Sequence, residues 1–234
     1  MSGIAVITAR GGSKRIPRKN IKSFCGQPII AYSIKAALES GIFAEVMVST
    51  DDREIAEIAE GYGAKVPFFR SAENSDDYAS TADVLLEVLG CYAPGKFDWL
   101  CCLYPTAPFV TGERLRQCCK VFNDKGAAAL IPIVRFSYPP QRAFIRQEGD
   151  RIGYLHPDNA FKRSQDLQPL YHDAGQFYFI RAAELLERKS LVPPETIGFE
   201  IAEAEVQDID TLSDWEMAEL KYTIWKKNHE KDGF

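Results

Sequence analysis

Short apolar runs alternate along the chain with segments whose apolar residues recur every three or four positions. The run 4–7 is uninterrupted by charge, as in a buried strand, whereas residues 28–40 place Ile30, Ile34 and Ala37 on one face of a helix. Strands are expected at 4–7, 45–50, 66–70, 98–104, 128–135, 176–180 and 206–210. Helices are expected at 28–40, 52–62, 81–91, 112–123 and 181–189, and a final helix opens at a capping box over 213–216. This alternation predicts an α/β fold, in which a mostly parallel sheet carries helices on both faces.

The alternation stops near Phe136. From there to Tyr171 the chain is rich in Pro, Gln, Arg and Asp, and Gly149-Asp150 between two short β-like runs predicts a hairpin. An excursion of this length inside a compact domain is typical of a lid, a binding loop or a dimer arm. We therefore expect a core made of residues 1–135 and 172–228, an inserted arm over 136–171 and a tail over 229–234.

Composition narrows the classes of function. The chain has 234 residues, enough for one α/β domain with a small appendage, and its net charge of -5 argues against a nucleic acid as the main partner. No apolar run is long enough for a membrane span, and the start of the sequence does not have the pattern of a signal peptide. The six cysteines include no Cys-x-x-Cys pair and the three histidines are scattered, so we expect reduced thiols in a cytoplasmic protein and no zinc site.

The loop from Ala9 to Asn20 carries the clearest chemical signal. Five of its twelve residues are cationic, namely Arg10, Lys14, Arg15, Arg18 and Lys19, and Gly11, Gly12 and Ser13 lie among them. Ligands of open α/β sheets bind where strands end, and glycine-rich backbone can turn its N–H groups toward an anion. The loop therefore predicts a phosphate cradle, although its spacing matches neither a P-loop nor a dinucleotide fingerprint. The alternative is a solvated basic loop, which the stiffening Pro17 disfavours.

Two acidic pairs follow expected strands. Asp208 and Asp210 are two residues apart, so both carboxylates can point to the same side of an extended segment. Mg²⁺ favours one or two carboxylates together with phosphate oxygens, which makes this pair a candidate metal site beside a bound polyphosphate. A helix-capping role for Asp210 is an equal alternative on spacing alone. For the other pair we expect a cap instead, formed by Asp51 together with Glu54.

Polar side chains also flank the strand that returns from the excursion. Residues 163–166 supply an arginine fork suited to a carboxylate, and residues 172–176 supply histidine and glutamine suited to hydroxyls or amides. Each segment alone could be an ordinary loop. Together they favour a polar acidic sugar over an apolar ligand.

The loop motif Ala9-Arg10-Gly11-Gly12-Ser13-Lys14, with Ile16-Pro17-x-Lys19-Asn20, resembles the signature of the cytidylyltransferases that activate acidic sugars, the CMP-sialic acid synthetase family. The likeness continues in order through 48–51, Arg70-Ser71, 75–81, Gly175-x-Phe177-Tyr178 and Val206-x-Asp208-Ile209-Asp210, so that it spans roughly 4–225. Segments 104–108 and 173–178 depart from the sialate synthetases. With 136–139 and 163–167, they resemble the branch of the family that acts on pseudaminic acid.

This resemblance implies a Rossmann-like nucleotidyltransferase sheet and a homodimer formed through the arm. It also implies transfer of CMP from CTP to the anomeric hydroxyl of pseudaminic acid, a nine-carbon acidic sugar, with release of pyrophosphate. Another acidic sugar is the main alternative: N-acetylneuraminic, legionaminic or 3-deoxy-octulosonic acid. A nucleotide-binding protein without catalysis and a nucleic-acid-binding module are alternatives of other classes.

Matching positions assign a role to each candidate residue. The nucleotide would be bound by Arg10, Gly11, Gly12, Ser13, Lys14, Asn20, Arg70 and Thr81. The sugar would be bound by Tyr104, Arg163, Gln165, Asp173 and Gln176. Mg²⁺ would be the cofactor, held by Asp208 and Asp210, and the residues expected to act in catalysis are Lys14, Lys19 and Asp208.

Overall fold

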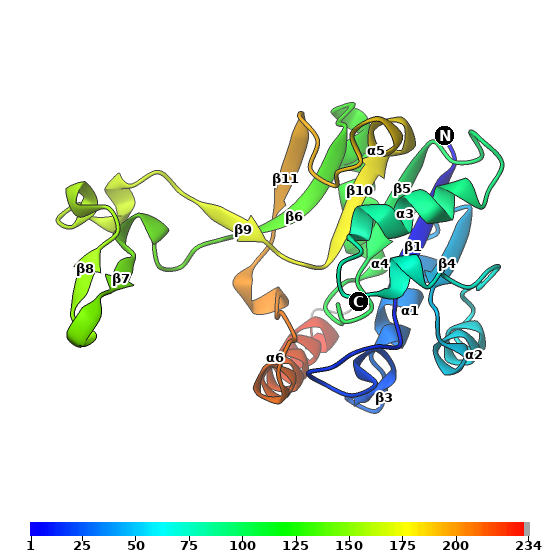
Figure 1. The fold of residues 1–234 in the computed structure, drawn as a ribbon, viewed down its shortest axis with the longest axis horizontal. Helices are drawn as coiled ribbons and strands as arrows, with labels where there is room; N and C mark the ends of the chain where they lie inside the picture. The colour runs from blue at the N-terminus through cyan, green and yellow to red at the C-terminus, as the bar shows by residue number, and fades with distance from the viewer. Residues whose placement is uncertain (232–234) are drawn as a thin grey trace.

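A seven-stranded sheet runs through the centre of the fold in the computed structural model, which describes residues 1–231 (Figure 1). Its strands are β1 (Gly3–Thr8), β4 (Glu45–Ser49), β5 (Trp99–Leu103), β6 (Ala129–Arg135), β9 (Tyr171–Asp173), β10 (Phe177–Arg181) and β11 (Thr196–Glu200). They follow the order β11-β6-β10-β5-β1-β4, and β9 also pairs with β6. Only β9 and β10 run against the others within this sheet, so the predicted mostly parallel α/β fold is confirmed.

Helices cover both faces of the sheet. One face packs against α1 (Ile30–Ser40), α2 (Arg53–Gly61) and α4 (Gly112–Asp124), and the other against α3 (Thr81–Gly90) and α5 (Ala182–Arg188). The central strand β1 shows why its sequence is apolar throughout. Ala5 and Ile7 enter the first core and Ile4 and Val6 enter the second, so that both sets of side chains are fully buried.

Two of the expected strands do not form. Residues 66–70 follow a single bridge between Met47 and Lys65, and the ladder stops there because Pro67 has no N–H to donate. Residues 206–210 are irregular, and the amide of Asp210 donates to the side chain of Asp214 instead of to a neighbouring strand. The sheet contains instead two strands that the pattern does not predict, β9 and β11, and both pair with β6.

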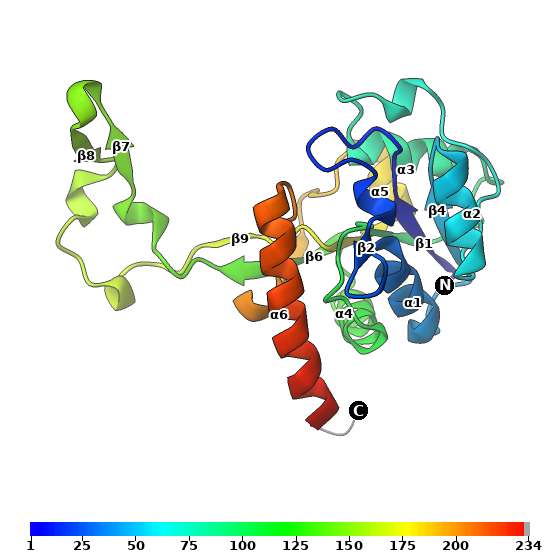
Figure 2. The same ribbon diagram turned by 90° about the horizontal axis from the view of Figure 1, so that it is seen from below.

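The predicted excursion is an arm that leaves the core after β6 and returns through β9. It carries the expected hairpin, made of β7 (Phe144–Arg146) and β8 (Ile152–Tyr154), with Gly149 and Asp150 at positive φ in the turn. Short 3₁₀ turns complete it at Pro140–Arg142, Glu148–Asp150, Pro157–Asn159 and Ser164–Asp166. The arm projects far from the core in both views (Figures 1 and 2). Its exposed apolar side chains include Phe144, Ile145, Ile152, Leu155 and Phe161.

A bulge marks the return of the arm to the sheet. Asp173 pairs with Ile133 and Phe179 pairs with Leu130, so five residues (174–178) lie opposite two residues (131–132) of β6. The three extra residues are too many for a continuous ladder. As a result, the segment between β9 and β10 is displaced at the edge where the strands of the core end.

The last helix, α6 (Leu212–Lys231), begins two residues earlier than the predicted capping box implies. Thr211 and Asp214 form the cap: the Asp214 amide donates to Thr211 Oγ1 at 3.2 Å, and the Thr211 amide donates to Asp214 Oδ2 at 2.7 Å. Trp215 packs edge-on against Phe24, with ring centroids 5.5 Å apart. Residues 229–231 of the expected tail are helical, and 232–234 lie outside the described residues. Within residues 1–231, no helix combines the length and apolar character needed to cross a membrane.

Candidate functional site

The basic loop lies at the carboxyl end of β1 and lines a cavity of about 440 Å³. The loop residues on its wall are Arg10, Ser13, Lys14, Arg15, Ile16, Lys19 and Asn20. A smaller cavity of about 250 Å³ includes Arg70 and Thr81 in its lining. Thr8, Arg10 and Asp77 line both cavities, so the two form one continuous site. Their combined size lies in the usual range for small-molecule sites.

Neighbouring carboxylates hold the loop in place. The Gly11 amide donates to Asp51 Oδ1 at 2.8 Å, which leaves this N–H unavailable to an anion, contrary to the role expected for it. Arg18 donates to both oxygens of Asp52, at 2.5 and 3.0 Å, and this hydrogen bonding is the main reason why the pKa of the Asp52 carboxyl lies below its usual value. Asp52 also caps α2 by accepting from the Ile55 amide at 3.0 Å, so Asp52, and not the predicted Asp51, is the cap.

Asp77 joins two of the cations at the boundary between the cavities. Arg10 lies 3.0 Å from Asp77 Oδ1, and Lys14 donates to Asp77 Oδ2. The hydrogen bond from Lys14 is the largest effect that keeps the pKa of the Asp77 carboxyl below its usual value. Arg10 also donates to the Asp76 carbonyl at 2.6 Å. A carboxylate of the protein itself therefore occupies the cationic groups that the sequence assigns to a nucleotide.

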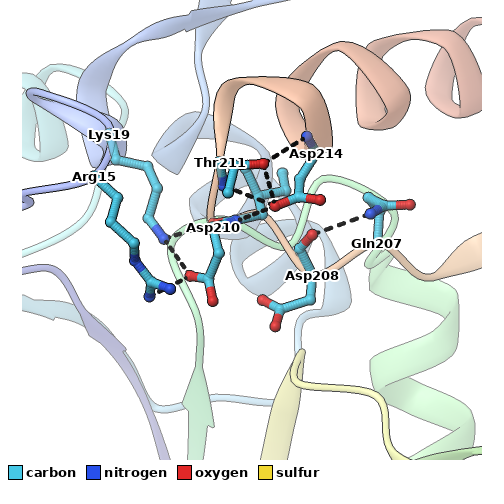
Figure 3. Close-up of polar contacts among 8 residues, drawn as sticks. Arg15, Lys19, Gln207, Asp208, Asp210, Thr211 and Asp214 are labelled. Atoms are coloured by element: carbon cyan, nitrogen blue, oxygen red, sulfur yellow. Dashed lines mark hydrogen bonds and ion pairs between the residues drawn. The ribbon is translucent and has the colours of Figure 1, made fainter. Parts of the chain in front are cut away.

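Asp210 joins two further cations of the loop (Figure 3). Arg15 lies 2.7 Å and Lys19 lies 3.6 Å from Asp210 Oδ1, and Lys19 also donates to the Ile209 carbonyl at 2.7 Å. Figure 3 shows the carboxylates of Asp208 and Asp210 projecting to the same side of their segment, as their spacing predicts. The loop and this segment, far apart in sequence, are thus held together by charge.

The donor set at this segment fits Mg²⁺. Both ion pairs of Asp210 end on Oδ1, and within residues 1–231 no hydrogen bond or ion pair reaches its Oδ2 or either carboxylate oxygen of Asp208. The same residues contain no cluster of three or more His, Cys, Asp or Glu side chains that could hold a metal. Mg²⁺ commonly uses one or two carboxylates and takes its remaining ligands from phosphate and water. Asp208 and Asp210 are therefore suitable ligands only in the presence of a polyphosphate.

The smaller cavity contains a buried cation and a hydroxyl. Arg70 is buried, its Nε donates to Ser49 Oγ at 3.0 Å, and burial lowers the pKa of its guanidinium. Thr81 is the first residue of α3, and its Oγ1 lies 3.4 Å from the Tyr104 hydroxyl. Asn20 is buried too, and its side chain donates to the Arg10 carbonyl at 2.9 Å. Asn20 therefore positions the main chain of Arg10 as well as lining the larger cavity.

A third cavity, of about 370 Å³, adjoins the first through Tyr104, which lines both. Its polar lining comprises Tyr104, His172, Asp173, Glu203, Gln207, Asp208 and Lys221. The bulge shapes it: Asp173 accepts from the Tyr178 hydroxyl at 2.6 Å and from the Gly175 amide at 2.8 Å. Burial raises the pKa of Tyr104 and of Tyr178, which keeps both phenols protonated as donors.

Three residues predicted to bind sugar lie away from this cavity. Gln176 is buried and donates to the Glu205 carbonyl at 2.6 Å, so it fastens the segment that precedes the acidic pair. Arg163 and Gln165 are exposed on the arm, where Arg163 pairs with Asp166 at 2.7 Å. Neither of these arm residues lines the cavity that contains Tyr104 and Asp173 of the same chain.

Sequence reasoning missed Asp77, Arg15 and Lys221 as members of the site. The first lies in the matched 75–81 loop, where an acidic residue facing a basic loop could have been suspected. The second was counted only as a charge of the loop. Lys221 had no signal, because a lysine on an amphipathic helix ordinarily faces water.

Known proteins resemble this chain along almost its whole length. The cytidylyltransferase family profile matches residues 4–223. The pseudaminic acid cytidylyltransferase of Campylobacter jejuni subsp. jejuni serotype O:2 is 44% identical over 233 residues, which cover 98% of this chain and 99% of that protein. The CMP-N,N'-diacetyllegionaminic acid synthase of Legionella pneumophila is 33% identical over 225 residues, which cover 92% and 94%.

A solved structure of a CMP:2-keto-3-deoxy-manno-octonic acid synthetase, complexed with CTP, superimposes with a TM-score of 0.70 and covers 97% of this chain and 100% of that chain. At 20% identity, this likeness concerns the fold, and it agrees with the nucleotidyltransferase sheet expected from the sequence. Since the profile match extends over almost the whole chain and the relatives align over nearly their full lengths, this chain belongs to the cytidylyltransferase family.

Proposed function

We propose that this enzyme transfers CMP from CTP to the anomeric hydroxyl of pseudaminic acid and releases pyrophosphate. The observation that carries the proposal is that Tyr104 lines both the cavity of the basic loop and the polar cavity at Asp173 and Asp208. Two substrates bound in these cavities would meet at that residue. The sugar is suggested by the 44% identity to the pseudaminic acid cytidylyltransferase of Campylobacter jejuni.

The residues of the site suit a phosphoryl-type transfer. In such a reaction the attacking hydroxyl lies in line with the departing group, and catalysis consists mostly of positioning and charge stabilisation. Lys14 and Lys19 would bind the phosphates, and Arg70 and Thr81 would line the nucleoside side. Mg²⁺ held by Asp208 and Asp210 would neutralise charge on the phosphate oxygens.

The arm supports a homodimer as part of the same proposal. Its apolar side chains are exposed in a single chain, and Arg163, which the sequence assigns to the sugar, lies away from the cavity that contains Tyr104 and Asp173. In a homodimer, the arm of the partner subunit would cover the sugar, and its apolar side chains and its arginine would become buried. A cytoplasmic location is supported by the six free thiols, of which Cys101, Cys102, Cys118 and Cys119 are buried.

A pyrophosphate-release assay tests the function. Purified enzyme is given CTP, Mg²⁺ and one of four acidic sugars: pseudaminic, legionaminic, N-acetylneuraminic or 3-deoxy-octulosonic acid. We expect turnover with pseudaminic acid, none when the sugar is omitted, and loss of turnover on chelation of Mg²⁺. Turnover with a different sugar would reassign the substrate. CTP binding by calorimetry without turnover on any sugar would favour a nucleotide-binding protein instead.

A further inference from the structure

The cavity beside Tyr104 has an excess of negative charge. Its lining contains the carboxylates of Asp173, Glu203 and Asp208, against a single lysine, Lys221. An acidic sugar brings a further carboxylate into this space. Without a cation to receive that group, the cavity would repel the substrate that the proposed function gives it.

Lys221 is placed to be that cation. It lies on α6, is half-buried, and its Nζ donates to the Val206 carbonyl at 2.9 Å. Val206 lines the same cavity, so the ammonium lies at the cavity wall. An ammonium has three N–H donors, and only one is used by this bond.

The neighbouring carboxylates do not form ion pairs with the Lys221 ammonium. Asp173 accepts from Tyr178 and Gly175, and Glu203 accepts from Ser137. Within residues 1–231, no carboxylate lies within ion-pair distance of the Lys221 ammonium. The positive charge therefore faces the cavity without an internal partner, in contrast to the cations that Asp77 and Asp210 hold.

We propose that Lys221 binds the carboxylate of the sugar substrate and so selects sugar acids over neutral sugars. This inference rests on the proposed function and adds a specificity-determining residue to it. The predicted carboxylate fork, Arg163, is paired with Asp166 on the arm and does not line this cavity in its own chain. Lys221 is the cation supplied by the same chain as the nucleotide cavity.

A structural role makes a different prediction. Lys221 fastens the carbonyl of Val206, and the chain reaches Asp208 two residues later. A lysine that served only this purpose would position the metal carboxylates. Its loss would lower kcat and weaken the response to Mg²⁺ and CTP, whatever sugar was supplied.

Steady-state kinetics separate the two roles. The variants are Lys221→Met, Lys221→Arg and, as a matched control, the exposed Lys227→Met on the same helix. We expect Lys221→Met to raise the KM for pseudaminic acid by about 10- to 100-fold, the usual range for a hydrogen bond to a charged group, with the KM for CTP within about twofold. Lys221→Arg keeps the charge and recovers most of the sugar affinity, and Lys227→Met matches the wild type.

A substrate analogue tests the contact itself. The C1 carboxamide of pseudaminic acid removes the negative charge from the substrate, as Lys221→Met removes the positive charge from the enzyme. We expect both changes together to cost no more than either alone, since a shared interaction can be lost only once. Circular dichroism and CTP calorimetry on Lys221→Met establish that the variant is folded.

The other outcomes contradict either the role of Lys221 alone or the proposed function as well. An unchanged sugar KM in Lys221→Met, or additive losses with the carboxamide, overturns the role of Lys221 while wild-type turnover still supports the proposed function. A reduced kcat and weaker CTP binding at unchanged sugar KM assigns Lys221 to the structural role. Absence of wild-type turnover on every acidic sugar overturns both proposals.

Discussion

Gly11 and Gly12 are neighbours in the basic loop, but only the first has no room for a side chain. A Cβ on Gly11 would lie 2.7 Å from Asp52 Oδ2, whereas a Cβ on Gly12 would meet nothing within 4 Å. Asp52 cannot move away easily, because it caps α2 and holds Arg18. The close approach of loop and helix at this point therefore depends on glycine.

We expect Gly11→Ala to lower the free energy of unfolding by about 1–3 kcal/mol, as overpacked positions do, and Gly12→Ala to change it by less than about 0.5 kcal/mol. Urea unfolding followed by circular dichroism measures both variants. Equal stabilities of the two variants would contradict the close approach at Gly11.

Asp77 is paired with Arg10 and Lys14, so it would compete with a nucleotide bound by these two cations. We expect Asp77→Asn to tighten CTP binding by about two- to tenfold, the effect of removing exposed ion pairs, and this gain should shrink at high salt. Calorimetry at two ionic strengths measures the change, and Asp124→Asn, which breaks an exposed pair with Lys120 on α4, is the control. Weaker CTP binding by Asp77→Asn would mean that Asp77 organises the cations more than it competes for them.

At the residue scale, the sequence predicted the positions of the charged side chains of the basic loop better than the hydrogen bonds of its backbone. Lys14 and Lys19 were assigned to a cavity that they do line. The expected role of Gly11 differs from the structure, because its amide faces Asp51, a residue 40 positions later. A partner so distant in sequence is set by the order of the strands, which the loop motif does not encode.

At the scale of elements, the start of α2 connects helix stability with the basic loop. Asp52 has a pKa below its unfolded value, chiefly because Arg18 donates to it. A carboxyl of this kind stabilises the fold above its unfolded pKa of about 3.9, and the contribution disappears as the pH falls through the lower folded pKa. The hydrogen bond that Asp52 accepts from the Ile55 amide lowers the same pKa further.

Asp52→Asn retains a good capping group but removes the charge. We expect it to lower the free energy of unfolding at pH 7 by about 0.2–1 kcal/mol, and Asp52→Ala to cost about 1 kcal/mol more through the lost cap. The deficit of Asp52→Asn should narrow below about pH 4, as the wild-type carboxyl becomes neutral. Urea unfolding across this range is the measurement, with Glu54→Gln as a control at the same arginine. A deficit that is independent of pH would exclude the ion pair as its cause.

Most elements were predictable because their apolar patterns are set by burial on the two faces of the sheet. The exceptions are instructive. Strand β9 is exposed along its whole length and β11 has Gly198 at its centre, so neither has an apolar pattern that indicates a strand. In 206–210 Val206 and Ile209 are buried, and in 66–70 Val66 and Phe68 are half-buried, but neither segment forms a long ladder. An apolar run indicates burial, and it does not by itself indicate hydrogen bonding to a neighbouring strand.

At the scale of the whole molecule, the projecting arm makes the proposed dimer testable by complementation. Lys14→Met disables the nucleotide cavity of its own chain, and Arg163→Met disables the arm that would reach the partner subunit. We expect each variant alone to be nearly inactive and a refolded equal mixture to recover about a quarter of wild-type activity, since half of the dimers would each have one intact site. Sedimentation establishes the dimer. Dimers that form without any recovery would place Arg163 outside the active site.

The bulge between β9 and β10 has a consequence for how this enzyme can diversify. Its ends are pinned by pairing to β6, and Ala174 and Gly175 line the cavity proposed for the sugar, whereas Gln176 is buried and bonded to the Glu205 carbonyl. We therefore expect substitutions at 174 and 175 to alter sugar preference while the strands that carry the nucleotide cavity stay in register. Variation at these two positions would change the preference for the sugar without changing the binding of the nucleotide.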